Sequence, residues 1–130
     1  MIIKDGDILL AMVISKKDTL EGEKNFFTDN AAEFQVASFN LAKDNNIERH
    51  YHPSQPREIL KTSEVILVQS GLIILKIYNK NFEEVESVRL SPGDVAILID
   101  GGHELIMEEN SQFIEVKQGP YDEQKDKKRF

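Results

Sequence analysis

The chain has 130 residues, of which 40% are hydrophobic and 30% are charged, and these proportions are typical of a single soluble globular domain. Its formal net charge of -7 argues against a nucleic-acid partner, because phosphate binding requires clustered Lys and Arg side chains. The absence of cysteine excludes disulfide bonds and thiolate metal ligands, and it agrees with a cytoplasmic location.

The first predicted strand is an apolar run that covers residues 8–15. This run has no clear period and could also form two turns of buried helix, but its length and its β-branched residues favour a strand. It is too short to span a bilayer, and the acidic residues Asp5 and Asp7 precede it where a signal peptide would carry bases. We therefore expect neither a membrane segment nor a targeting sequence.

The next segment, residues 16–30, is polar and charged and is predicted to be a loop. Its aromatic pair, Phe26-Phe27, is expected to pack on the core, because burial is the commoner use of large aromatic side chains. Residues 33–41 begin in the alternation typical of a strand, and residues 47–52 alternate again after an Asp-Asn-Asn turn. Two further strands are therefore predicted in this part of the chain.

A proline-containing loop, residues 53–63, follows these strands. Pro53 and Pro56 restrict its backbone, so we expect an ordered flap. Arg57 in this loop has the chemistry to bind a carboxylate or a phosphate of a ligand. The alternative is a surface arginine that is exposed to water or paired with Glu58.

The second half of the sequence predicts an all-β fold. Apolar or alternating runs separated by turn residues indicate strands at 64–68, 72–78, 84–90, 95–99, 104–107 and 113–117. Regular short strands with no amphipathic helix between them are typical of a β-sandwich or barrel. We expect one domain over residues 1–120 and a charged tail over residues 121–130. Such tails are usually mobile, but the terminal Phe130 suggests docking, for example on a second subunit.

Four residues at strand starts form a candidate metal site. His50 and His52 are two positions apart, so in a strand both side chains leave the same face. Glu64 opens a later strand, and His103 follows another strand and the turn Asp100-Gly101-Gly102. Three imidazoles and one carboxylate are a suitable ligand set for a mononuclear metal ion.

These residues carry a resemblance to the cupin superfamily. The pair His50-x-His52 is followed by Glu64, six residues and Gly71, which is similar to the first cupin motif, and residues 91–103 resemble the second. The resemblance implies a cupin-type jelly-roll barrel (a double-stranded β-helix), a homodimer, and metal ligands at His50, His52, Glu64 and His103. The loop 53–63 is longer than in the family's pattern, which makes it a candidate for ligand specificity.

The ligand set leaves the metal and the activity open. Nitrogen-rich ligands favour Fe, Mn, Co, Ni or Zn over Mg or Ca, and the alternative is a metal-free pocket in which the same residues bind a ligand by hydrogen bonds. By resemblance, the protein is a small metal-dependent enzyme (an isomerase, dioxygenase or lyase) that acts on a sugar derivative or a small acid. The alternative is a binding module for a sugar or sugar nucleotide, since residues 115–121 are similar to cupins of cell-surface polysaccharide synthesis. No catalytic residue is assigned, and the candidate general bases are Glu48, Tyr51 and Glu104.

Overall fold

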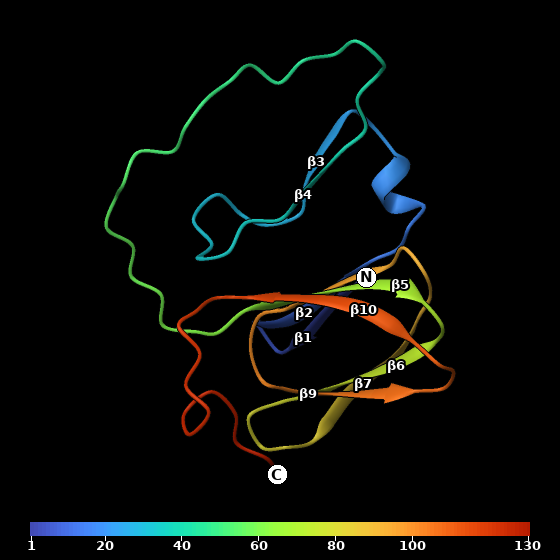
Figure 1. Ribbon diagram of the computed structural model, residues 1–130. Helices are drawn as coiled ribbons and strands as arrows, with labels where there is room; N and C mark the ends of the chain where they lie inside the picture. Colours follow the sequence, from blue (N-terminus) through green and yellow to red (C-terminus); the bar gives the residue numbers. More distant parts are fainter. The chain divides into compact units, whose positions relative to one another are not determined.

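The computed structural model describes all 130 residues, with the exception of the side chain of Leu20. Its contacts divide the chain into two compact units (Figure 1). The first unit consists of Met1–Lys16 and Lys61–Phe130, and the second consists of Lys17–Leu60. The single domain expected over residues 1–120 stays a prediction.

The larger sheet of the first unit has five antiparallel strands in the order β1-β2-β8-β5-β10. Their bounds are β1 Ile2–Asp5, β2 Ile8–Ile14, β8 Val95–Leu98, β5 Glu64–Ser70 and β10 Gln112–Lys117. The smaller sheet has three antiparallel strands in the order β7-β6-β9. Their bounds are β7 Glu84–Leu90, β6 Ile73–Tyr78 and β9 Gly102–Met107. Neither sheet closes on itself.

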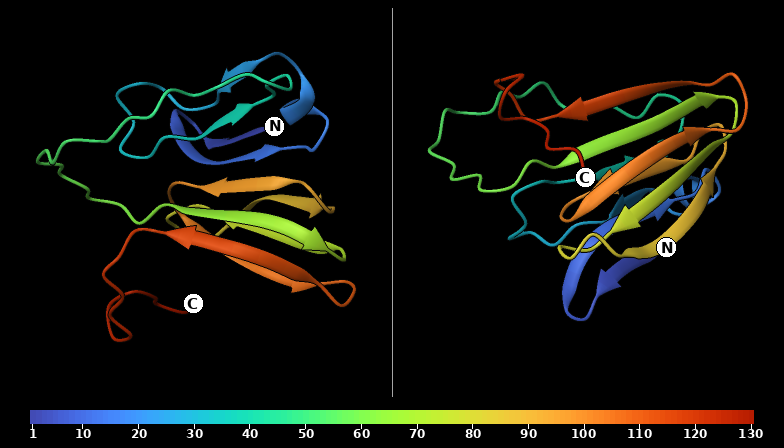
Figure 2. Two further views of the ribbon diagram at one scale, coloured as in Figure 1. Left: turned by 45° about the horizontal axis from the view of Figure 1, so that its top comes forward. Right: turned by 90° about the horizontal axis from the view of Figure 1, so that it is seen from below.

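The two sheets of the first unit pack face to face as a sandwich (Figure 2). Strand periodicity causes this, because every second side chain leaves the same face of a strand. In β6 the alternate residues Ile73, Leu75 and Ile77 are fully buried. In β5 Ile66 and Val68 are buried in the same way, while the intervening Leu67 is partly exposed. The core therefore lies between the sheets.

The turn from β5 to β6 depends on Gly71. This residue has φ of +81°, a left-handed conformation that favours glycine. A Cβ atom at this position would collide with the backbone carbonyl of Asn110 and with Ser111. The turn is therefore tight because glycine lets the β9–β10 connection approach it closely.

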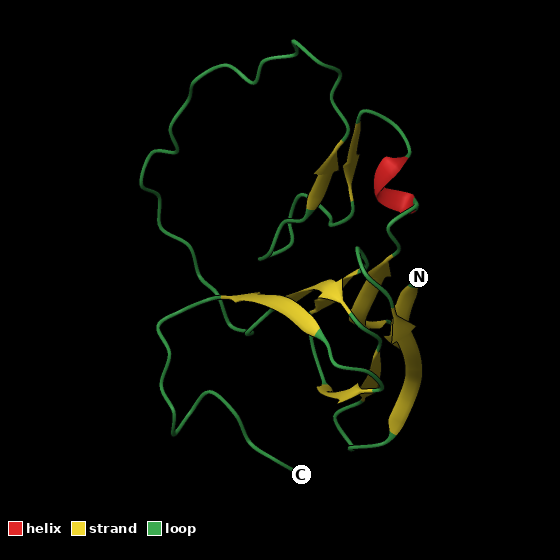
Figure 3. Cartoon of the chain, turned by 45° about the vertical axis from the view of Figure 1, so that its right-hand side comes forward, coloured by secondary structure: helices red, strands yellow, loops and turns green.

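The second unit is mostly loop (Figure 3). It contains one short 3-10 helix, η1 Asp18–Leu20, and an antiparallel pair of strands, β3 Lys24–Phe26 and β4 Ala37–Phe39. Two predictions are wrong here. The expected strand at 33–41 is reduced to β4, and residues 47–52 form no strand, since their backbone joins no ladder.

The expected burial of the aromatic pair is also wrong for Phe26. Its side chain is 66% exposed and packs edge to face on Phe39, with 6.2 Å between ring centroids. The prediction failed because residues 24–26 form a strand whose partner places Phe26 beside another ring. The all-β prediction is confirmed, since no α-helix occurs among the described residues. In that part of the chain, no helix is both long enough and apolar enough to cross a membrane.

Candidate functional site

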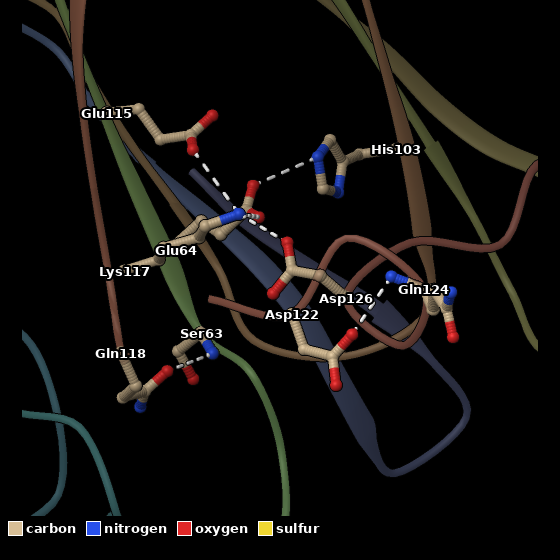
Figure 4. A network of polar contacts seen from close by, with 9 residues as sticks. All are labelled: Ser63, Glu64, His103, Glu115, Lys117, Gln118, Asp122, Gln124 and Asp126. Carbon is tan, nitrogen blue, oxygen red and sulfur yellow. Dashed lines mark hydrogen bonds and ion pairs between the residues drawn. The ribbon is translucent and has the colours of Figure 1, made fainter. Parts of the chain in front are cut away.

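Glu64 and His103 meet between the two sheets of the first unit. Glu64 is the first residue of β5 and shares the inner face of that strand with Ile66. His103 lies on β9 opposite Ile77 of β6, and the side chain of Ile77 is in the core. His103 Nε2 is 3.1 Å from Glu64 Oε2 (Figure 4). The structure therefore brings together two of the four predicted metal ligands.

The chain segments before these two residues are joined by a cluster of charges. Asp100, in the turn before β9, accepts a hydrogen bond from Lys61 at 2.6 Å and is 3.4 Å from the Lys80 ammonium. Burial opposes ionisation of this carboxyl, but the bond from Lys61 and the backbone N–H of Gly101 hold its pKa below the ordinary value. Because Lys61 precedes β5, this cluster connects the approach to Glu64 with the approach to His103.

The Glu64 carboxylate is charged at neutral pH. The hydrogen bond with His103 lowers its pKa, burial acts in the opposite direction, and the positive charge of Lys117 adds to the lowering. The side chain is only 9% exposed, so most of its interactions are with protein atoms. An ionised carboxylate and an imidazole nitrogen are both competent donors to a metal ion.

Lys117 of β10 completes a polar cluster around Glu64. It lies directly across the strand pair from Glu64, and its Nζ is 3.9 Å from Glu64 Oε1 and 3.7 Å from Glu115. Its closest partner is Asp126, at 2.5 Å, and this hydrogen bond raises the pKa of Lys117 above its ordinary value. Lys117 therefore carries a positive charge at neutral pH, surrounded by three carboxylates (Figure 4).

Asp126 comes from the C-terminal tail, which folds back on the sandwich. A turn at Asp122 holds this part of the tail, because the backbone N–H groups of Lys125 and Asp126 both donate to the Asp122 carbonyl. The Tyr121 ring lies 5.2 Å from the Lys117 ammonium. The side chain of Asp126 is 9% exposed, so the tail covers this end of the polar cluster.

The end of the tail is held by aromatic contacts. Phe130 stacks on Phe82 with centroids 4.4 Å apart and meets Tyr78 edge to face at 5.4 Å. It also lies close against Gly102, where a side chain would collide with the ring. The expected docking of Phe130 is confirmed, and the surface it uses belongs to its own chain. Aromatic contacts at Phe130 and the ion pair of Asp126 therefore hold the tail on the first unit.

His50 and His52 belong to the second unit. Their rings pack edge to face, 5.2 Å between centroids, and His50 Nδ1 is 2.8 Å from the carbonyl oxygen of Glu48. Both side chains are exposed. Within either unit, no group of three or more His, Asp or Glu side chains among the described residues is arranged to hold a metal ion. The four-residue ligand set stays a prediction.

The candidate general bases are distributed over both units. Glu104 faces away from the His103 side of β9 and accepts a hydrogen bond from the Tyr78 hydroxyl at 3.0 Å, so its carboxylate does not face Glu64. Glu48, Tyr51 and Arg57 are exposed residues of the second unit.

Sequence reasoning missed Lys117 and Asp126. Alternation along β10 was the available signal for Lys117, since Phe113, Glu115 and Lys117 are in phase. No local pattern indicates Asp126.

Comparison of the chain with protein-family models, with curated proteins and with solved structures gives no match.

Proposed function

We propose that this chain is a metal-binding protein of the cupin type that takes a polar small molecule at the Glu64–His103 end of the sandwich. The observation that carries the proposal is the approach of these two side chains from facing sheets, 3.1 Å apart. The ionised state of Glu64 adds support, because metal ligands must be deprotonated.

The order of the strands supports a jelly roll. β6 and β7 form an inner hairpin, β5 and β8 flank it in sequence and pair with each other, and β9 and β10 then add to β6 and β5. This nested pairing across two sheets is the pattern of a rolled-up antiparallel hairpin with Greek-key connections. With β1 and β2, which precede β5 in the chain and extend its sheet beyond β8, the first unit has the eight strands of a jelly roll.

The donor set must be larger than two. Transition-metal sites in proteins ordinarily have at least three protein ligands. Glu64 and His103 supply only two of them, one carboxylate and one imidazole. The chain has three histidines in total, and the other two are His50 and His52. The cupin resemblance implies that these two complete the set, and three nitrogens with one oxygen suit Fe, Mn, Co, Ni or Zn. A bound divalent ion of this kind supplies Lewis-acid polarisation of a carbonyl or hydroxyl.

The residues around the pair define what the site can take. Ile66 and Val68, beyond Glu64 on the same face of β5, are almost fully buried and close the interior with apolar atoms. Lys117 adds a positive charge 3.9 Å from Glu64, and Glu115 adds a negative charge 3.7 Å from Lys117. A small ligand with hydroxyl or carboxylate groups, such as a sugar derivative or a small acid, matches these polar groups.

Two activities are compatible with such a site. Lys117 favours a small metal-dependent enzyme of the isomerase, dioxygenase or lyase type, because it is a titratable group 3.9 Å from the carboxylate of Glu64, a proposed metal ligand. A binding module for a sugar or sugar nucleotide is favoured by the filled interior behind Glu64. Turnover in the presence of the saturating metal separates the two activities.

Metal titration of untagged, chelator-treated protein tests the proposal. We expect one equivalent of a transition metal to bind and to raise the melting temperature. When the free metal concentration is a hundred times the Kd, binding stabilises the folded state by about 2.7 kcal/mol. His52→Ala, Glu64→Gln and His103→Ala should each lower metal occupancy and this thermal shift together. Glu104→Gln is the matched control, because Glu104 neighbours His103 but bonds to Tyr78 on the other face of β9.

Each variant has a result that argues against its assignment. Unchanged metal occupancy in His52→Ala would remove His52 from the ligand set. Occupancy below about one tenth of an equivalent in the unmodified protein, with no recovery when metals are added, would remove the metal altogether. In that case the site would be a metal-free pocket.

A further inference from the structure

The chemistry of Lys117 is not explained by the metal proposal. An ammonium group is not a metal ligand at neutral pH, yet its side chain is only 16% exposed and lies beside Glu64. Its Nζ donates to Asp126 Oδ2 at 2.5 Å, the shortest of its three carboxylate distances. A charge-assisted bond of this kind is the standard way in which a protein holds an organic anion.

Asp126 reaches Lys117 from the tail and not from the sandwich. The turn at Asp122 and the ring of Phe130 hold the tail on either side of Asp126. Phe130 remains 62% exposed, so its contacts are those of a weakly docked segment. The carboxylate that binds Lys117 therefore belongs to the tail, which can undock without disturbing the core.

We infer that Lys117 is the anchor for the carboxylate of a small organic acid, and that Asp126 occupies this anchor as an internal competitor. The inference rests on the proposed ligand site at Glu64 and His103 and names the class of ligand that it takes. At Nζ itself, one carboxylate takes the place of another. The ligand's carboxylate replaces that of Asp126 on Nζ, and the rest of the ligand then lies beside Glu64 and His103, whose mutual distance is 3.1 Å.

The arrangement makes ligand binding and tail docking mutually exclusive at Lys117. A site that is free for only a fraction of the time binds its ligand with an affinity lowered by that fraction. A charge-assisted hydrogen bond that is partly screened by solvent holds the closed form in excess by about tenfold. Removing the carboxylate of Asp126 should therefore strengthen binding of a small acid by about tenfold.

Calorimetric titration of the intact 130-residue chain, free of metal, with malonate tests the inference, with the neutral malonamide as the control ligand. We expect Asp126→Asn to bind malonate about tenfold more tightly than the unmodified chain. Lys117→Met should abolish binding, also in combination with Asp126→Asn. Glu123→Gln, which removes one exposed acid from the same turn, should bind like the unmodified chain.

Equal malonate affinity in Asp126→Asn and in the unmodified chain would overturn the competition. Undiminished binding by Lys117→Met, checked for folding by its melting curve, would overturn the anchor. Because the titration contains no metal, its result is separate from that of the metal titration. Malonate binding without metal uptake would leave this inference in place and refute the metal, and the reverse result would do the opposite.

Discussion

Substitution of Phe130 by alanine tests whether the tail is held by its terminal ring. Phe130 makes a stacked contact with Phe82, at 4.4 Å and 25°, and an edge-to-face contact with Tyr78, at 5.4 Å and 82°. Such pairs contribute about 0.5–1.5 kcal/mol each. The ring is 62% exposed, so we take the lower half of that range and expect Phe130→Ala to cost the docked tail about 1–2 kcal/mol in total.

A loss of this size changes the fraction of undocked tail and leaves the fold intact. One kcal/mol or two corresponds to a factor of roughly 5–30 in the undocked population. Proton NMR shifts of Gly102 provide the assay, because the Phe130 ring lies directly against this residue. We expect the ring-current shift of Gly102 to disappear in Phe130→Ala, while the melting temperature changes little.

A second variant reaches the same end without removing the ring. A Cβ atom at Gly102 would lie 2.7 Å from two Phe130 ring atoms, so Gly102→Ala should displace Phe130 by steric collision. Lys128→Ala, an exposed change in the same tail, is the control. If neither Phe130→Ala nor Gly102→Ala alters the release of the tail, the aromatic contacts do not hold it and our reasoning is refuted.

Three further predictions concern the sandwich. Leu75→Ala should lower the free energy of unfolding by about 2–5 kcal/mol in urea denaturation, because Leu75 is completely buried in the core. Gly71→Ala should cost more than about 1 kcal/mol by the same measurement, since it combines a φ of +81° with a collision against Asn110. The pKa of Glu64 is lowered in the folded state from its ordinary value of 4.5. The contribution of the ionised carboxylate to the free energy of unfolding should therefore be lost as the pH falls below 4.5.

Each of these predictions has its own control. Ile106→Ala, at a site 40% exposed on the smaller sheet, should cost much less than Leu75→Ala. Gly119→Ala should be nearly neutral beside Gly71→Ala, because no atom lies within 4 Å of an added Cβ. For Glu64, His103→Leu should raise the carboxyl pKa toward its ordinary value, observed by carbon NMR. An unchanged Glu64 titration in that variant would show that His103 does not lower its pKa.

Local sequence pattern was sufficient for most of the sandwich. The runs at 8–15, 64–68 and 84–90 were predicted within a few residues, because each is short, contains β-branched residues and is separated from its neighbours by turn residues. The 8–15 run was the ambiguous one, and it is the strand β2. Pattern failed at 47–52, where alternation is present but no ladder partner pairs with the segment.

The candidate site was predicted in part for a different reason. Glu64 and His103 were found because they stand at strand starts in a familiar spacing, and facing sheets then bring them together. Lys117 and Asp126 were not found, since their meeting depends on the tail folding back over nine positions of sequence. Long-range contacts of this kind leave no period in the sequence, and only tertiary structure reveals them.

The Glu64–His103 pair also has a mechanical consequence. The two sheets share no backbone ladder, so the layers are held together by apolar packing and, at this end, by a polar bridge from β5 to β9. Any molecule that binds both side chains acts as a clamp on the opening of the layers. Its occupancy should slow amide exchange in β5 and β9 before it changes the global melting temperature. Local exchange at these two strands is therefore a ligand screen that requires no knowledge of the reaction.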